Sequence, residues 1–260
     1  MDKGELKLLW KNVFADEDAY IERFFSQVYN HRQTLTYQEN GHIVSMLHMI
    51  PYTLQIEGKC FPAMYLYALA TEERFRGRKI MSGLICKAHR IAEERGYLCS
   101  FLIPEGESLF GFYQRFGYTV PFYDSGIVIQ PHKLCHEIGI SETDVSNDGL
   151  WEMMQSFYKG QNKVIMLHRE QFDFFLTDFY ESGGRIYKIT ESKTVLGYAY
   201  GICKNGEIVI SHTNMDTKVL TGKKINAVIT YHIRGVFRPT QLCYDLGIDL
   251  NGIYVKNVLC

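Results

Sequence analysis

The sequence lacks a strong charge of either sign, because 28 lysine and arginine residues accompany 29 aspartate and glutamate residues. The formal net charge of −1 argues against a nucleic acid or an anionic membrane as the main partner. No apolar run is long enough to cross a bilayer, and residues 1–5 do not resemble a secretory signal. We therefore expect a cytoplasmic protein that does not bind membranes.

The sequence also lacks any Cys-x-x-Cys pair, although it contains seven cysteines. A secreted disulfide scaffold is shorter and has more closely spaced cysteines, so we expect reduced thiols. His132, Cys135 and His136 lie close together, but no fourth ligand follows at a matching spacing. The sequence therefore predicts no metal site.

What the chain does contain is enough apolar sequence for a large core, with 46% hydrophobic residues among 260. Apolar spacing predicts helices over 4–13 and 17–29, with Asp16 as a cap for the second helix. Alternating residues predict strands over 34–39, 42–54 and 58–70. The turns between them lie at Asn40-Gly41 and at Glu57-Gly58, and Asn-Gly is a strong hairpin signal.

The next elements expected are a helix over 78–95, a buried strand over 97–103 and a helix over 107–116. A hairpin follows over 118–130. Residues 132–148 are polar without a clear period, so we interpret 1–131 as a first domain and 132–148 as a linker.

The remaining residues, 149–260, are expected to form a smaller second domain. We predict helices over 149–158 and 169–182, strands over 185–190, 195–203 and 206–212, a helix over 222–235 and a strand over 252–259. This order of two helices and three strands resembles the start of the chain and suggests a degenerate internal repeat.

The residues with the clearest chemistry lie between a strand and an amphipathic helix. Unpaired amides at a helix N-terminus accept anions, glycine permits close approach of the backbone, and basic side chains add attraction for a diphosphate. The alternative is a solvated basic turn before an ordinary helix. The candidate residues for cofactor binding are Arg76, Gly77, Arg78, Lys79, Ile80, Met81 and Ser82.

Three segments together resemble the GNAT acetyltransferases, whose diphosphate loop reads Arg/Gln-x-x-Gly-x-Gly/Ala. Residues 67–78 are similar to the family's strand and loop, 97–103 to its next strand, and 112–118 to its Tyr-x-x-x-Gly-Phe segment. The resemblance covers about residues 1–130. Leu9-Trp10, Phe24-Phe25 and Leu102-Ile103-Pro104 most resemble the enhanced-intracellular-survival type, which carries tandem GNAT-like domains.

The resemblance implies a mixed α/β (α+β) fold with a mostly antiparallel sheet, one parallel strand pair and a degenerate second GNAT-like domain without cofactor. It also implies acetyl-CoA as co-substrate and direct attack of an amine in a ternary complex. Backbone amides near Leu69, Ala70 and Thr71 would polarise the acetyl carbonyl, and Tyr113 would protonate the departing thiolate. The pantetheine arm would lie between the strands at 65–71 and 97–103.

The sequence departs from the family's loop motif at two positions, and several alternatives stay open. Lys79 and Met81 stand where the motif has small residues. The acceptor amine and the length of the acyl chain are not defined by the sequence. A non-catalytic module that binds acyl-CoA or another protein is the alternative function, and a homo-oligomer is an open alternative. The candidates for a general base are Glu72, Glu105, Glu107, His48 and the C-terminal carboxylate of Cys260.

Overall fold

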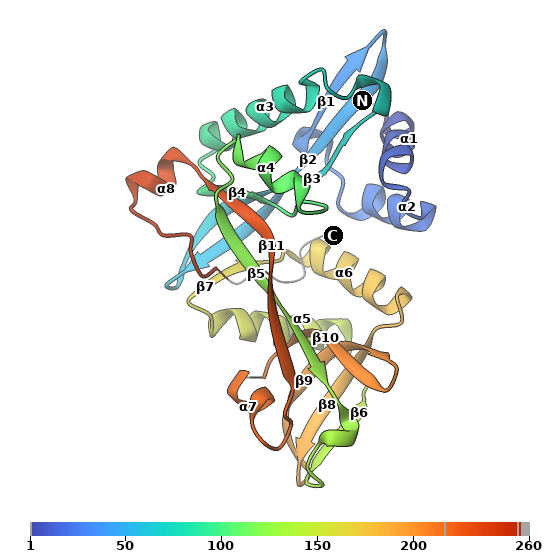
Figure 1. Ribbon diagram of the computed structural model, residues 1–260, viewed down its shortest axis with the longest axis vertical. Helices are drawn as coiled ribbons and strands as arrows, with labels where there is room; N and C mark the ends of the chain where they lie inside the picture. Colours follow the sequence, from blue (N-terminus) through green and yellow to red (C-terminus); the bar gives the residue numbers. More distant parts are fainter. Residues whose placement is uncertain (1, 216, 254, 256–260) are drawn as a thin grey trace.

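The computed structural model describes residues 2–215, 217–253 and 255 (Figure 1). Its first half contains, in chain order, α1 (Lys3–Phe14), α2 (Asp18–Gln27), β1 (Thr34–Glu39), β2 (His42–Ile56), β3 (Lys59–Thr71), α3 (Ile80–Glu94), β4 (Cys99–Leu102), α4 (Ser108–Gln114) and β5 (Val120–Ile129). The second half contains β6 (Ile138–Glu142), α5 (Asn147–Lys159), β7 (Lys163–Met166), α6 (Arg169–Glu181), β8 (Arg185–Glu191), β9 (Thr194–Lys204), β10 (Glu207–Thr213), α7 (Thr217–Thr221), β11 (Val228–Pro239) and α8 (Gln241–Asp245). Among the described residues, no helix is both long and apolar enough to cross a membrane.

The strands form a hydrogen-bonded path through both halves, in the order β1-β2-β3-β4-β11-β5-β10-β9-β8-β6, and β7 also pairs with β2. Within the described part of the chain, β3 and β4 are the one parallel pair, and the other recorded pairs are antiparallel. This confirms the expected mixed, mostly antiparallel sheet.

Two tight turns connect the first three strands. Asn40 and Gly41 have φ angles of 51° and 84°, and Glu57 and Gly58 have φ angles of 49° and 77°. Left-handed conformations at both central positions match the twist of the flanking strands. The expected hairpins over β1–β2 and β2–β3 are therefore confirmed.

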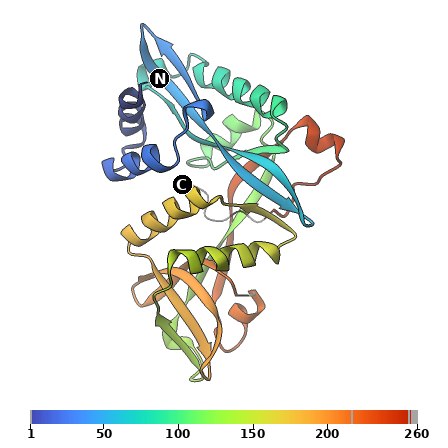
Figure 2. The same cartoon turned by 180° about the vertical axis from the view of Figure 1, so that it is seen from behind.

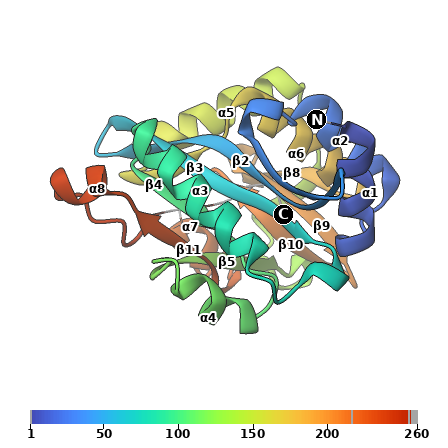
Figure 3. The ribbon, with the colours of Figure 1, turned by 90° about the horizontal axis from the view of Figure 1, so that it is seen from above.

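Helices cover both faces of these strands. Leu84, Ile85 and Ala88 of α3 pack with Leu47 and Leu66 in one buried cluster. The other face carries α1 and α2, which lie on the opposite side of β1–β3 from α3 in Figure 1. Seen from above, α5 and α6 lie beside β2 on the side away from α3 (Figure 3). β3 is consequently buried on both faces over most of its length.

Two expected elements in the sequence differ in the structure. Residues 118–130 were expected as a hairpin, but β5 runs through them as one strand. The helix expected over 222–235 is wrong: α7 ends at Thr221, and most of that stretch belongs to β11. Val228, Ile229 and Thr230 are β-branched and favour a strand, and β11 finds partners on both sides in β4 and β5.

Smaller differences concern caps and short elements. Asp16 does not cap α2; it accepts a hydrogen bond from Trp10 Nε1 at 2.7 Å, and Glu17 occupies the N-cap position. The expected strand over 252–259 lies mostly outside the described residues.

Strands of the second half pair directly with the first half. β7 pairs with β2 and β11 pairs with β4, so hydrogen bonds cross the expected boundary. The segment 132–148 contains β6, which pairs with β8. The order α5, α6, β8, β9, β10 repeats that of α1, α2, β1, β2, β3, apart from the short β7. The division at 131 and 148 stays a prediction.

An ionic contact joins the two halves on the side of α2. Arg23 Nη2 lies 3.1 Å from Asp178 Oδ1 of α6, and the same guanidinium pairs with Glu181. The guanidinium also lies over the Phe174 ring, at 5.5 Å from its centroid. Figure 2 shows α6 directly facing α2. These contacts join α2 of the first half to α6 of the second half.

Two buried histidines give the fold a predicted pH dependence. Burial lowers the pKa of His48 and His89 to about 3, helped at His89 by the charge of Arg238. An unfolded histidine has a pKa of about 6.5, so between about pH 6.5 and 3 the unfolded chain binds protons that the native chain does not. The free energy of unfolding should therefore fall as the pH falls, by up to about 1.4 kcal/mol per pH unit for each histidine.

Urea denaturation at pH 7, 6 and 5 would measure this slope. His89→Gln should make it shallower, since glutamine keeps a polar partner for Tyr118 and does not titrate. The same change at the exposed His132 is the control. An equal slope in the wild type and the His89→Gln variant would contradict the assignment.

Candidate active site

The basic loop between β3 and α3 surrounds a cavity of about 420 Å³. After Thr71 the chain forms a short 3-10 turn, η2 (Glu73–Phe75), before α3 begins at Ile80. Gly77 has a φ of 76°, which glycine adopts without steric cost. The residues lining this cavity are Thr71, Phe75, Arg76, Gly77, Lys79, Ile80, Met81, Ser82, Phe112 and Arg115.

Arg78 is the one predicted loop residue that does not line this cavity. Its Nη2 lies 2.9 Å from Glu39 Oε1 on β1, and its guanidinium lies over the Phe75 ring. The pairing lowers the pKa of Glu39. Arg78 thus links the loop to β1 and does not face the cavity.

The composition of the cavity suits a phosphate group. Arg76, Lys79 and Arg115 contribute three cations, and none of the described residues in the lining is a carboxylate. Arg76 Nε donates to the Thr71 carbonyl at 3.1 Å, which orients the guanidinium. The first amides of α3 have no intrahelical acceptor, and the helix dipole adds about 0.3–1 kcal/mol for an anion. The sequence reasoning missed Arg115, because it lies at the end of α4 and reaches the loop only through the fold.

Lys79 has a backbone conformation that favours glycine. Its φ of 61° lies in the left-handed region, and it is the N-cap residue of α3. A side chain in that conformation costs roughly 1–2 kcal/mol, which glycine avoids. In this chain Lys79 adopts the strained conformation, and its side chain adds a positive charge to the cavity lining.

Strands β3 and β4 separate beside the loop. Their parallel pairing runs from Ala63–Cys99 to Tyr65–Phe101 and stops there. Beyond Tyr65, β3 keeps its pairing with β2 on the other side. Among the residues that the structure describes, no strand pairs with β3 on its β4 side beyond Tyr65. An edge of this kind can pair with an extended ligand.

A β-bulge lies within this unpaired stretch of β3. The pairing with β2 shifts between Met46 and His48, so that β3 holds an extra residue opposite β2. Ala68 has a φ of 47° there. Three residues of this stretch were predicted to polarise a carbonyl. Leu69 and Thr71 line a second cavity, described below, whereas the Ala70 side chain is fully buried. Bulges redirect the backbone groups next to them.

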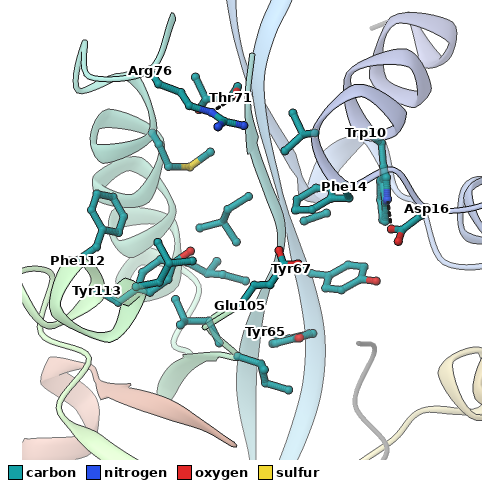
Figure 4. A pocket seen from close by; sticks show the side chains of 18 of the residues that line it. Trp10, Phe14, Asp16, Tyr65, Tyr67, Thr71, Arg76, Glu105, Phe112 and Tyr113 are labelled. Atoms are coloured by element: carbon teal, nitrogen blue, oxygen red, sulfur yellow. Dashed lines mark hydrogen bonds between the residues drawn. The ribbon is translucent and has the colours of Figure 1, made fainter. Parts of the chain in front are cut away.

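A second cavity, of about 810 Å³, adjoins the first, and Figure 4 shows most of the side chains that line it. The two cavities share Thr71, Arg76, Met81 and Phe112. Figure 4 shows Arg76 and Thr71 at one end, Phe112 and Tyr113 on one side, and Trp10, Phe14 and Asp16 on the other. The full lining is Trp10, Val13, Phe14, Asp16, Tyr65, Leu66, Tyr67, Ala68, Leu69, Thr71, Arg76, Met81, Leu102, Ile103, Glu105, Leu109, Phe112, Tyr113 and Arg234.

Tyr113, the predicted acid, lies on α4 in the wall of this second cavity. Its side chain is largely buried and packs edge-on against Phe112, at 5.1 Å between centroids. Burial raises the pKa of Tyr113 to about 12, and the charge of Glu105 acts in the same direction. The hydroxyl therefore carries its proton at every physiological pH, as a proton donor must.

His48 is buried in the core and does not line either cavity. It packs against Trp10 at 5.8 Å between ring centroids, and its Nδ1 lies 2.8 Å from Thr34 Oγ1. Because burial lowers its pKa to about 3, it does not bind a proton near neutral pH. Its placement matches that of a structural histidine.

The predicted carboxylate bases divide by position. Glu72 pairs with Arg74 at 2.7 Å, and Glu107 is exposed at the N-cap of α4; neither lines the two cavities. Glu105 lines the larger cavity. Cys260 lies outside the described residues. The assignment of a base stays a prediction, with Glu105 placed beside the cavity.

Several lining residues carried no local signal in the sequence. Trp10, Phe14 and Asp16 come from α1 and the α1–α2 connection. Arg234 comes from β11, at a bulge where the pairing with β5 shifts between Ile233 and Gly235. A Cβ at Gly235 would lie 2.4 Å from the Leu102 carbonyl oxygen, so glycine is needed for β11 to pass this close. The second half thus contributes one wall residue.

A family model described as "Acetyltransferase (GNAT) domain" matches residues 2–120. No curated protein matches the sequence significantly.

Three solved structures with a similar fold each match 92% of this chain. One is a conserved protein of unknown function from Enterococcus faecalis, a probable N-acyltransferase, at TM-score 0.69, 13% identity and 70% of its length. Eis1 from Mycobacterium abscessus matches at TM-score 0.66, 10% identity and 71% of its length. A GCN5-related N-acetyltransferase from Anabaena variabilis matches at TM-score 0.70, 14% identity and 71% of its length. The likeness extends through both halves and confirms the expected resemblance to the enhanced-intracellular-survival type at the level of the fold.

Proposed function

We propose that this chain, which contains an acetyltransferase domain of the GNAT family over residues 2–120, transfers an acetyl group from acetyl-CoA to a primary amine. The transfer proceeds by direct attack of the amine within a ternary complex. GNAT domains take acetyl-CoA as their acyl donor, and the two adjoining cavities offer places for both ends of such a donor.

One observation carries the proposal: two adjoining cavities, which share four lining residues, extend from a cationic loop to a buried tyrosine. Arg76, Lys79 and Arg115 lie at the loop end, and Tyr113 lies in the wall further along. The unpaired edge of β3 lies between them. This arrangement favours a ligand with an anionic head and an extended, hydrogen-bonding arm. The same features argue for catalysis over simple binding, because a binding module needs no proton donor.

In the proposed reaction, the amine nitrogen attacks the acetyl carbon and the carbon–sulfur bond breaks. Amides near Leu69, Ala70 and Thr71, beside the bulge, would stabilise charge on the carbonyl oxygen, and one such donor is worth about 3 kcal/mol. Tyr113 would pass its proton to the leaving thiolate. The attacking amine must first lose a proton, which costs about 4–5 kcal/mol at pH 7 for a lysine-like amine. Glu105, which lines the larger cavity, would receive it directly or through water.

Release of free thiol from acetyl-CoA, measured with and without a panel of primary amines, tests this proposal. We expect amine-dependent thiol release, with the acetylated amine detected by mass spectrometry in equal amount. Calorimetry should show that acetyl-CoA binds. Binding of acetyl-CoA without amine-dependent thiol release would support the non-catalytic alternative instead.

A further inference from the structure

We infer that Lys79 binds a phosphate group of acetyl-CoA, and that the same lysine destabilises the protein when no donor is bound. The inference rests on one part of the proposed function, acetyl-CoA as the donor, and is independent of the acceptor and of catalysis. It concerns the smaller cavity, which is lined by the loop between β3 and α3 and by the first turn of α3.

The backbone at Lys79 is strained, and no structural role of the residue requires a lysine. Its φ of 61° and ψ of 15° are left-handed, a conformation in which the β carbon crowds the following carbonyl. As N-cap residue, Lys79 accepts a hydrogen bond from the Gly83 N–H at 3.1 Å, but through its backbone carbonyl, which any residue provides. Its side chain is a donor only and cannot cap the amides of α3. Strained residues of this kind cluster at positions that hold ligands.

The charge of Lys79 is also unfavourable in the free protein. The N-terminal end of a helix carries a partial positive charge, which repels a cation. The Lys79 side chain is exposed, and no carboxylate of the described residues pairs with it. By contrast, Arg74 pairs with Glu72, and Arg78 pairs with Glu39. Within the part of the chain that the structure describes, no interaction therefore offsets this strain and repulsion, whereas a bound anion would.

The other cations of the cavity are likewise available to an anion. Arg76 donates to the Thr71 carbonyl, and the Arg115 guanidinium lies 5.0 Å from the centroid of the Phe112 ring. Neither is paired with a carboxylate among the described residues. A cluster of three such cations suits a ligand with several negative charges, as the diphosphate and the 3′-phosphate give to acetyl-CoA.

The lining also indicates which end of the donor Lys79 would meet. Arg76, at one end of the larger cavity in Figure 4, lines both cavities, whereas Lys79 and Arg115 line only the smaller one. Tyr113 lines only the larger cavity. With the acyl group beside Tyr113, the phosphates of the donor would lie on the side of Lys79.

Two substitutions of Lys79 separate its charge from its backbone strain. Lys79→Met and Lys79→Gly both remove the ammonium, but only glycine relieves the left-handed conformation. We expect the Kd of acetyl-CoA, measured by calorimetry, to rise about tenfold in both variants. The Tm of the free protein should rise by about 2–4 °C in Lys79→Gly and should not rise comparably in Lys79→Met.

Two further variants serve as controls. Lys79→Arg keeps the charge and should hold the Kd within about threefold of the wild type. Lys87→Met removes a charge from an exposed position of α3 that lines neither cavity, and its Kd should not change. An unchanged Kd in both Lys79→Met and Lys79→Gly would overturn the inference and leave the proposed function standing. A wild-type protein that does not bind acetyl-CoA would overturn both.

Acetyl-dephospho-CoA, which lacks the 3′-phosphate, identifies the group that Lys79 binds. If Lys79→Met raises the Kd equally for this compound and for acetyl-CoA, the diphosphate is the partner. If the effect disappears with acetyl-dephospho-CoA, the partner is the 3′-phosphate. Either result supports the inference. A Tm of Lys79→Gly at or below that of the wild type would overturn the second part of the inference, that the lysine destabilises the free protein.

Discussion

Replacing Tyr113 by phenylalanine is expected to lower kcat about 100-fold while leaving the Kd of acetyl-CoA nearly unchanged. The ring stays, so its packing against Phe112 is preserved and only the hydroxyl is lost. General acid catalysis contributes about 100- to 10,000-fold. We expect the lower end, because a thiolate whose conjugate acid has a pKa of about 8.5 leaves partly unaided.

The burial of Tyr113 makes a further aspect of this experiment testable. Since its pKa is raised to about 12, the hydroxyl stays protonated throughout the usual assay range. Wild-type kcat should therefore rise with pH as the amine loses its proton, without a decline at pH 9–10 caused by loss of the tyrosine proton. A decline there that disappears in Tyr113→Phe would contradict the raised pKa.

Tyr97→Phe is the matched control, because Tyr97 loses the same hydroxyl and does not line either cavity. Its kcat should equal that of the wild type. If Tyr113→Phe instead raises the Kd of acetyl-CoA and keeps kcat at saturation, the hydroxyl anchors the donor and is not the acid. Normal kinetics in Tyr113→Phe would remove this residue from the mechanism.

Replacing Gly77 by aspartate should raise the Kd of acetyl-CoA about 100-fold. A Cβ at this position would have no neighbour within 4 Å, so steric crowding is small, and the effect comes from charge. Two unit charges 4 Å apart repel by about 4 kcal/mol at an effective dielectric constant of 20. Salt and exposure reduce this, and about 2.7 kcal/mol corresponds to the expected factor.

Gly77→Asn is the matched control for this variant. Asparagine has nearly the same shape and also tolerates the left-handed conformation that Gly77 adopts at a φ of 76°. Its Kd should rise by less than about tenfold. Calorimetry at low and high salt measures both variants, and the difference between them should shrink as salt is added. Equal affinities in Gly77→Asp and Gly77→Asn would place the diphosphate elsewhere.

Much of the fold was accessible from local patterns. The hairpin at Asn40-Gly41 depends on φ angles that these two residues adopt more readily than most. The strand before Gly77 and the helix after it were predicted within two residues of their observed bounds. Such features depend on the conformational preferences of neighbouring residues, which the sequence states directly.

The helix expected over 222–235 shows where local patterns fail. Its apolar residues at 225, 229 and 233 are spaced by four, as on a helix face. The choice of a strand depends on β4 and β5, which are more than 90 residues earlier in the chain and leave a place between them. A strand forms its backbone hydrogen bonds only with such partners, so whether this segment becomes a strand depends on tertiary structure.

The candidate site likewise has features that contiguous residues determine and features that only tertiary structure determines. By itself, the sequence determined that a glycine-containing cationic loop precedes an amphipathic helix, and that Tyr113 follows in a family-like segment, because these are contiguous residues. Tertiary structure decided that Arg78 turns to Glu39, that Arg115 joins the loop, and that Asp16 and Arg234 reach one cavity. The reason is physical: a charge acts on what lies within a few ångströms, and only the folded sheet determines which distant residues come that close.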